Sequence, residues 1–183
     1  MKSSVLFLGV FVSLAFSILE SSAQENWPRF RGGNAMSVAN DDPRLPDRWS
    51  SKENVQWKTD VPGLGWSCPV IWGNRVFLTT VVCDAAGENE APKVGLYLGE
   101  GRKEIPKGTH HWLTYCFDIE TGKVLWKAEA QQGTPPVGRH PKNTYASETP
   151  TTDGERLYVL FGDLGLWCYD MEGRKLWEHR IDP

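Results

Sequence analysis

The chain has 183 residues, of which 40% are hydrophobic and 23% charged, and its formal net charge at pH 7 is -3. A weakly acidic chain with scattered charges offers no basic patch to nucleic acid or to an anionic membrane surface, so neither is expected as a partner.

The first 23 residues have the pattern of a secretory signal peptide. Lys2 precedes an apolar run over residues 5–19, and the small residues Ser21 and Ala23 suit cleavage by a signal peptidase. An uncleaved anchor is the alternative, but this run of 15 residues is shorter than the roughly 20 that span a bilayer. We therefore expect a periplasmic or secreted protein that has no transmembrane segment after cleavage and begins with an extended segment at residues 24–53.

Two later stretches share a pattern of Cys, aromatic residue, Asp, glycine turn and Trp: "YCFDIETGKVLW", ending at Trp126, and "WCYDMEGRKLW", ending at Trp177. Each follows short runs of aromatic and β-branched residues separated by glycine turns, which is typical of antiparallel strands. The sequence predicts two four-stranded units, at residues 67–129 and 147–181. Their strands are expected near residues 75–82, 112–118, 123–129, 155–161, 165–170 and 174–180.

A single sheet of this kind cannot bury both of its faces and needs neighbours, so the predicted fold class is all-β, a β-propeller of four-stranded antiparallel blades. About two blades are present, which is an incomplete ring. A third copy of the repeat ending, around Trp57, predicts a lone closing strand at residues 54–60. Because propellers typically have about 4 to 8 blades, we expect an N-terminal fragment that lacks the C-terminal blades of its own full-length chain.

The turn residues of the repeat have local structural roles. Asp118 and Asp170 can accept hydrogen bonds from backbone N–H groups two residues later, and Gly122 and Gly173 can adopt the left-handed backbone that closes the last hairpin. Neither aspartate needs a catalytic role.

Trp126 and Trp177 begin the outermost strand of each unit, where a large flat side chain can cover the seam to the next sheet. A platform that stacks on carbohydrate is the alternative for these two residues.

The four cysteines fall into two groups. Cys116 and Cys168 hold equivalent places in two repeats, and a whole repeat unit separates them by more than the roughly 4.4–6.8 Å between Cα atoms that a disulfide needs. Both are expected to be small buried thiols. For Cys68 and Cys83 the sequence leaves the disulfide state open.

The first repeat ending resembles the pyrroloquinoline-quinone-like (PQQ-like) β-propeller repeat and its Trp-docking pattern. The matching positions are Cys116, Asp118, Thr121, Gly122 and Trp126, whereas the second copy is one residue shorter and lacks the Thr. The opening "NWPRFRGGNAMSVA" also resembles the start of exported bacterial members. The resemblance implies either a scaffold without cofactor or a dehydrogenase that holds pyrroloquinoline quinone and calcium on the propeller axis.

The dehydrogenases of this family carry an adjacent Cys-Cys pair, which this chain lacks, and their calcium ligands have no counterpart that can be placed here. We therefore expect no cofactor; the alternative is pyrroloquinoline quinone with calcium, if the complete chain is a dehydrogenase.

Two long connections, at residues 83–111 and 129–146, emerge on the same face of a meander, and loops of this length are usually binding elements or disordered. Adjacent histidines on an extended segment point in opposite directions, and no Cys or carboxylate completes a metal spacing, so no metal site is expected. Recognisable catalytic motifs are also absent. The candidate partner-binding residues are His110, His111, Arg139, His140, Lys142, Asn143 and Tyr145.

The leading hypothesis is an exported, non-catalytic propeller whose loop face binds a protein or glycan partner. The alternative is the N-terminal part of a pyrroloquinoline-quinone-dependent oxidoreductase.

Overall fold

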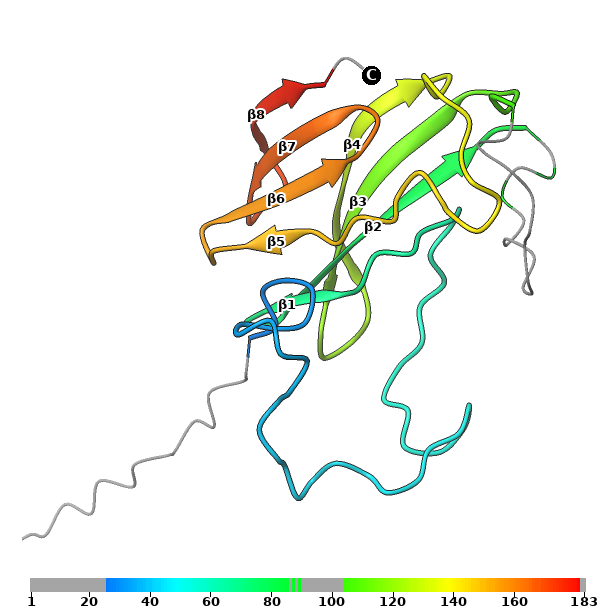
Figure 1. The fold of residues 1–183 in the computed structure, drawn as a ribbon. Coiled ribbons are helices and arrows are strands. Elements are labelled where there is room, and N and C mark those ends of the chain that lie inside the picture. The colour runs from blue at the N-terminus through cyan, green and yellow to red at the C-terminus, as the bar shows by residue number, and fades with distance from the viewer. Residues whose placement is uncertain (1–25, 86, 88, 90–103, 182–183) are drawn as a thin grey trace, which may run out of the picture.

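The computed structural model describes residues 26–85, 87, 89 and 104–181 (Figure 1). The expected signal peptide and most of the 83–111 insertion lie outside the described residues. Regular structure in the described part of the chain consists of strands.

The first sheet contains β1 (Val70–Trp72), β2 (Arg75–Cys83), β3 (His110–Asp118) and β4 (Val124–Gly133). All neighbours are antiparallel and follow chain order. β4 pairs with β3 as far as Gly133, opposite His110, so the following connection begins at residue 134 rather than at the expected 129.

The second sheet repeats this order with β5 (Thr151–Thr152), β6 (Arg156–Phe161), β7 (Gly165–Asp170) and β8 (Lys175–Arg180). The predicted all-β class, with two antiparallel four-stranded units, is confirmed. β-branched and aromatic residues in these strands alternate between the two faces of the sheet, as the period of two requires.

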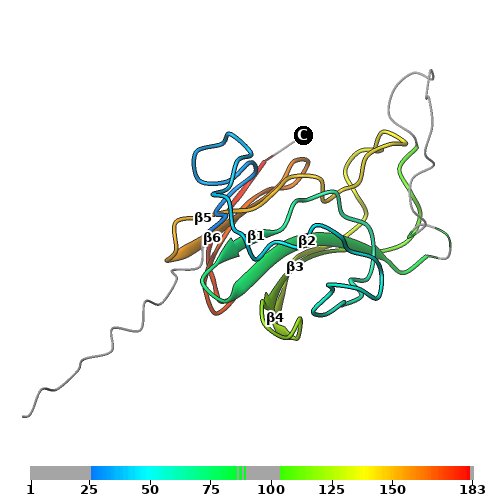
Figure 2. The same cartoon turned by 90° about the horizontal axis from the view of Figure 1, so that it is seen from below.

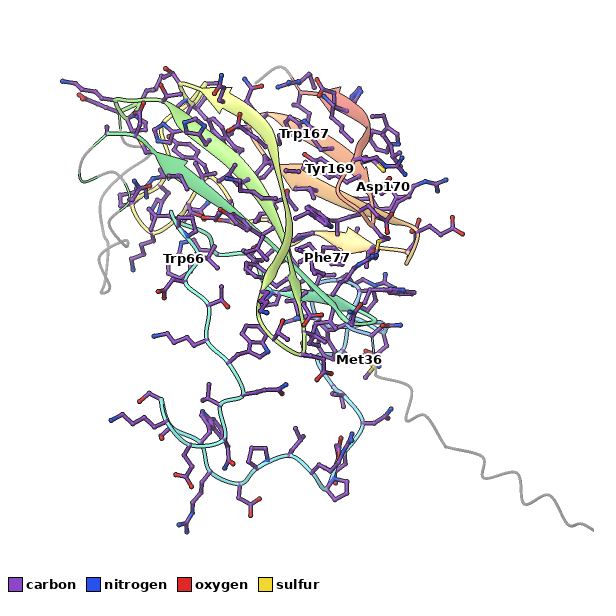
Figure 3. The ribbon with its side chains drawn as sticks, turned by 180° about the vertical axis from the view of Figure 1, so that it is seen from behind. Met36, Trp66, Phe77, Trp167, Tyr169 and Asp170 are labelled. Atoms are coloured by element: carbon purple, nitrogen blue, oxygen red, sulfur yellow. The ribbon has the colours of Figure 1, made fainter. Side chains whose placement is uncertain are left out.

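The two sheets lie side by side and bury one core between them (Figure 1). Phe77 from the first sheet and Trp167 and Tyr169 from the second lie in this core (Figure 3). Their almost complete burial removes a large apolar area from water, which is the main force holding the sheets together.

The other face of the first sheet carries a second apolar cluster, built from Val76, Leu113, Tyr115 and Phe117. Val61 packs against it, and the backbone of Leu64 exchanges two hydrogen bonds with Val81, at 2.9 and 3.0 Å. The segment at residues 61–64 thus covers part of this face.

Near the N-terminus, Trp27 exchanges backbone hydrogen bonds with Ile71 of β1, at 2.8 and 2.9 Å, and the Pro28 carbonyl accepts one from the Thr152 N–H of β5 at 2.9 Å. These two residues therefore bridge the first strands of both sheets. Figure 2 shows the blue N-terminal segment near β1 and β5.

After Met36, labelled in Figure 3, the chain leaves the sheets in a wide excursion, drawn in light blue to cyan in Figure 1. It contacts the first sheet again at Trp57, whose indole N–H donates to the Ile119 carbonyl. Residues 54–60, expected as a closing strand, form no regular strand, because no neighbouring strand lies beside them in the described part of the chain.

No helix among the described residues is long and apolar enough to cross a membrane.

Candidate functional site

The meander gives the two sheets a turn end and a loop end. The turn end contains the short hairpins at residues 73–74, 119–123, 153–155 and 171–174. The loop end contains the connections at residues 84–109, 134–150 and 162–164. The two long connections therefore leave the same end, and they meet around a small cavity lined by Cys83, Asn89, His110, Arg139 and Tyr145, among others.

Two tryptophans at the turn end make matching contacts with glycine hairpins. The Trp126 indole N–H donates to the Met171 carbonyl at 2.9 Å, and a Cβ on Gly173 would lie 2.6 Å from the Trp126 ring. The Trp57 indole N–H donates to the Ile119 carbonyl at 2.7 Å, and a Cβ on Gly122 would lie 2.4 Å from its ring.

Both of these glycines have positive φ, 68° for Gly122 and 84° for Gly173, which disfavours any residue with a side chain. Trp126 thus connects the first sheet to the hairpin at residues 171–174 of the second sheet. Trp57 makes the same contact with the hairpin at residues 119–123 of the first sheet. Sequence analysis missed a third contact of this kind, Trp72 against Gly154, where a Cβ would lie 2.3 Å from the ring.

The two repeat aspartates hold their own hairpins. Asp118 accepts hydrogen bonds from the N–H and the hydroxyl of Thr121, at 2.8 and 2.7 Å. Asp170 accepts from the backbone N–H groups of Glu172 and Arg174, at 3.1 and 2.8 Å, and from the Arg174 guanidinium. The Thr121 hydroxyl, more than any other group, lowers the pKa of Asp118.

Trp177 lies on the face of the second sheet that points away from the first, with its ring 6.2 Å from Tyr158. Trp177 is 42% exposed, and Leu160 and Leu176 are also partly exposed.

None of the four cysteines forms a disulfide, and Cys83, Cys116 and Cys168 are buried. Burial raises the pKa of the Cys116 thiol to about 12, so this thiol is not a nucleophile near neutral pH.

The adjacent histidines lie on opposite faces of β3. His110 is buried, with its ring edge-on to Tyr145 at 5.6 Å and its Nδ1 3.3 Å from the Gly108 carbonyl. His111 is half-exposed and its Nδ1 lies 2.8 Å from a Glu129 carboxylate oxygen. His110 therefore packs inside the loop end, while His111 pairs along the sheet.

The other candidate residues come together in one loop. The Arg139 guanidinium donates to the Asn143 carbonyl at 2.7 Å, and the Asn143 N–H donates to the His140 carbonyl at 2.9 Å. The Lys142 N–H donates to His140 Nδ1 at 3.1 Å, and the Tyr145 hydroxyl donates to the Val137 carbonyl at 2.8 Å. These bonds fold residues 137–145 into a defined shape, with His140, Lys142 and Asn143 exposed.

A polar cavity of about 260 Å³ lies between this loop and the β6–β7 turn. The candidate residues Arg139, His140, Asn143 and Tyr145 line it, together with Glu148 and Asp163. Sequence analysis missed Glu148 and Asp163, because only the folded meander brings the β6–β7 turn to the β4–β5 connection.

Trp66 was also missed. Its side chain is 53% exposed at the edge of the first sheet (Figure 3), and its backbone N–H donates to the Ala146 carbonyl at 2.9 Å. Its position after two glycines in "PGLGWS" was the available signal, since segments rich in glycine approach neighbouring backbone closely.

A family model described as outer membrane protein assembly factor BamB, a PQQ-repeat model, matches residues 51–183. The chain belongs to this PQQ-repeat family. The resemblance read from the repeat endings is thereby confirmed, and the two sheets are units of a β-propeller module. No curated protein matches the chain.

Some PQQ-like propellers hold a quinone and calcium, and calcium is bound by several oxygen ligands. The described residues contain no group of three His, Cys, Asp or Glu side chains placed to hold a metal ion. The four cysteines are all separate in sequence, so no adjacent pair is available.

Proposed function

We propose that this protein is an exported, non-catalytic scaffold of the cell envelope, periplasmic or secreted, whose loop end binds a protein partner. The observation that carries the proposal is the self-bonded loop at residues 137–145, which holds His140, Lys142 and Asn143 out to solvent in one arrangement. A loop ordered before binding loses little conformational entropy when a partner binds, and this raises affinity.

The family description supports a protein partner rather than a chemical reaction, because it names an assembly factor for outer membrane proteins. We carry over to this chain only the class of function, which is binding another protein in the envelope. In this proposal the scaffold works without quinone or metal.

The contrast between the two ends supports the location of the surface. Tryptophan rings and hydrogen bonds within the hairpins occupy the turn end, as Trp57, Trp72 and Trp126 show. The loop end instead presents a cationic side chain, a histidine and an amide at exposed positions of the 137–145 loop. Charged rim residues of this kind steer association and select partners.

The test is site-specific photo-crosslinking in the native cell, with the crosslinking residue at position 140 and, as control, at position 123 in the exposed β3–β4 turn. A discrete protein adduct at position 140 and none at position 123 is expected. Adducts from position 123 alone, or from neither position, would refute a protein-binding loop end.

A further inference from the structure

The polar cavity beside the loop has a composition that suits a ligand of its own. At about 260 Å³ it lies just below the range of about 300 to 1,000 Å³ typical of sites for drug-sized ligands, so it suits a small molecule. It is open on one side and lined by side chains from the β4–β5 connection and the β6–β7 turn.

The cavity presents hydrogen-bond donors and acceptors together. Arg139 uses one guanidinium N–H on the Asn143 carbonyl and has further N–H groups available, and the Asn143 side-chain oxygen accepts from the Ser147 hydroxyl, which leaves its NH₂ group as a donor. Glu148 supplies carboxylate oxygens as acceptors. A Cβ on Gly162 would lie 2.6 Å from the Glu148 Oε1, so the glycine makes the room that this carboxylate occupies.

This mixture selects against simple ions. The Arg139 guanidinium faces the same cavity as the Glu148 and Asp163 carboxylates, so a phosphate or a metal cation would meet a like charge as well as an opposite one. A hydroxyl group both donates and accepts, so a row of vicinal hydroxyls satisfies such a lining without adding charge.

An exposed aromatic residue, Trp66, lies on a segment that is bonded to the cavity loop. Trp66 is bonded through its backbone to Ala146, which lies in the chain between the lining residues Tyr145 and Glu148. The exposed indole of Trp66 is therefore carried by a segment whose backbone is bonded to the cavity loop. Saccharides have C–H groups on one ring face and hydroxyls around the edge, and Trp suits contacts that are apolar at one end and wet at the other.

We propose that this cavity binds a neutral saccharide, with Arg139, Asn143 and Glu148 bonded to its hydroxyls and Trp66 as the stacking surface. The site goes beyond the proposed function, because its ligand is a small sugar or the end of a glycan chain rather than a protein.

The probes are maltotriose, cellotriose and chitotriose, titrated at millimolar concentration into the purified protein and followed by calorimetry. At least one is expected to bind saturably. Glu148→Ala and Trp66→Ala are each expected to weaken that binding by about tenfold, as loss of a hydrogen bond to a charged group or of a stacked ring predicts. Glu155→Ala, at an exposed position in the turn end, is the matched control and leaves binding unchanged.

Glu148→Gln distinguishes a sugar from a charged ligand. Its amide oxygen still accepts from a hydroxyl, so saccharide binding falls by no more than about threefold. A zwitterion such as diglycine needs the charge, so binding of diglycine that Glu148→Gln abolishes would overturn the proposal. Absence of binding by all three trisaccharides would overturn it too.

The two proposals fail separately. Lys142 does not line the cavity, so Lys142→Glu leaves saccharide binding unchanged even where it weakens the protein partner. Thermal melting of each variant shows that a loss of binding is not a loss of fold.

Discussion

At the scale of single residues, the same contact occurs twice, one repeat unit apart. Trp57 and Trp126 each donate to the carbonyl of the residue that follows the repeat Asp, Ile119 in one case and Met171 in the other. Each ring lies against the hairpin glycine. The indole ring covers apolar surface at the contact with the hairpin, and its N–H group fixes the orientation of the ring. One side chain therefore supplies both apolar burial and a directional hydrogen bond.

Replacing Trp126 by Ala should lower the free energy of unfolding by about 3 kcal/mol, the low end of the range for truncating a core Trp, because the ring is half-buried. Urea unfolding of the purified protein measures it. Leu125→Ala is the control, since this neighbour is 48% exposed and its truncation should change stability by no more than about 0.5 kcal/mol. A loss below about 1 kcal/mol for Trp126→Ala would mean that the ring does not hold the seam.

The Asp118 hairpin makes a prediction about acid stability. The Thr121 bonds hold the pKa of Asp118 below its ordinary value of about 3.9, so the stabilisation is complete above about pH 4 and is lost as the pH falls through the lowered pKa. The stability difference between wild type and Asp118→Asn should therefore shrink between pH 7 and about pH 2.

Denaturant unfolding across that pH range provides the measurement. Asp41→Asn, at an exposed position outside both sheets, serves as the matched control. A difference for Asp118→Asn that stayed constant with pH would show that its carboxylate does not stabilise the turn.

At the scale of elements, the N-terminal residues Trp27 and Pro28 act as a strap across the first strands of both sheets. The Trp27 carbonyl accepts from the Ile71 N–H and the Pro28 carbonyl from the Thr152 N–H, both at 2.9 Å. The strap covers backbone groups that would otherwise be exposed at the edges of two sheets.

Trp27→Ala should loosen the strap, because a Cβ on Gly32 would lie 2.8 Å from the Trp27 ring and the indole thus fixes the local turn. Hydrogen exchange should then speed up by about tenfold at the Ile71 and Thr152 amides, while the central amides of β6 stay protected. Phe30→Ala, at a position 55% exposed, is the control. Unchanged exchange at both amides would show that the strap is not held by Trp27.

The elements also show what the sequence could reveal. Period-two alternation and glycine turns were enough to predict the strands, because both signals are local. The contacts of Trp72 with Gly154 and of Pro28 with Thr152 join residues that are far apart in sequence, so no local sequence pattern predicts them. The length of the connection was enough to single out the loop residues Arg139 to Tyr145 as binding candidates. Glu148 and Asp163 could be added only once the fold of the second sheet showed that they line the same cavity.

At the scale of the whole molecule, the tryptophan contacts between hairpins lie at the turn end, and the proposed binding surface lies at the loop end. The second sheet also leaves Leu160, Leu176 and Trp177 partly exposed. Trp177 holds in the second sheet the repeat position that Trp126 holds in the first, and Trp126 contacts the hairpin of the neighbouring sheet from that position. Repeated contacts of this kind between neighbouring units are typical of a radial array.

Partner binding at the loop end is tested by the dissociation constant of the protein captured at position 140, measured for two matched charge reversals. Lys142→Glu, on the loop end, should weaken binding by about tenfold, whereas Lys123→Glu, on the turn end, should leave it within about twofold of wild type. The reverse pattern, with Lys123→Glu weakening binding and Lys142→Glu leaving it unchanged, would contradict a loop end that binds the partner.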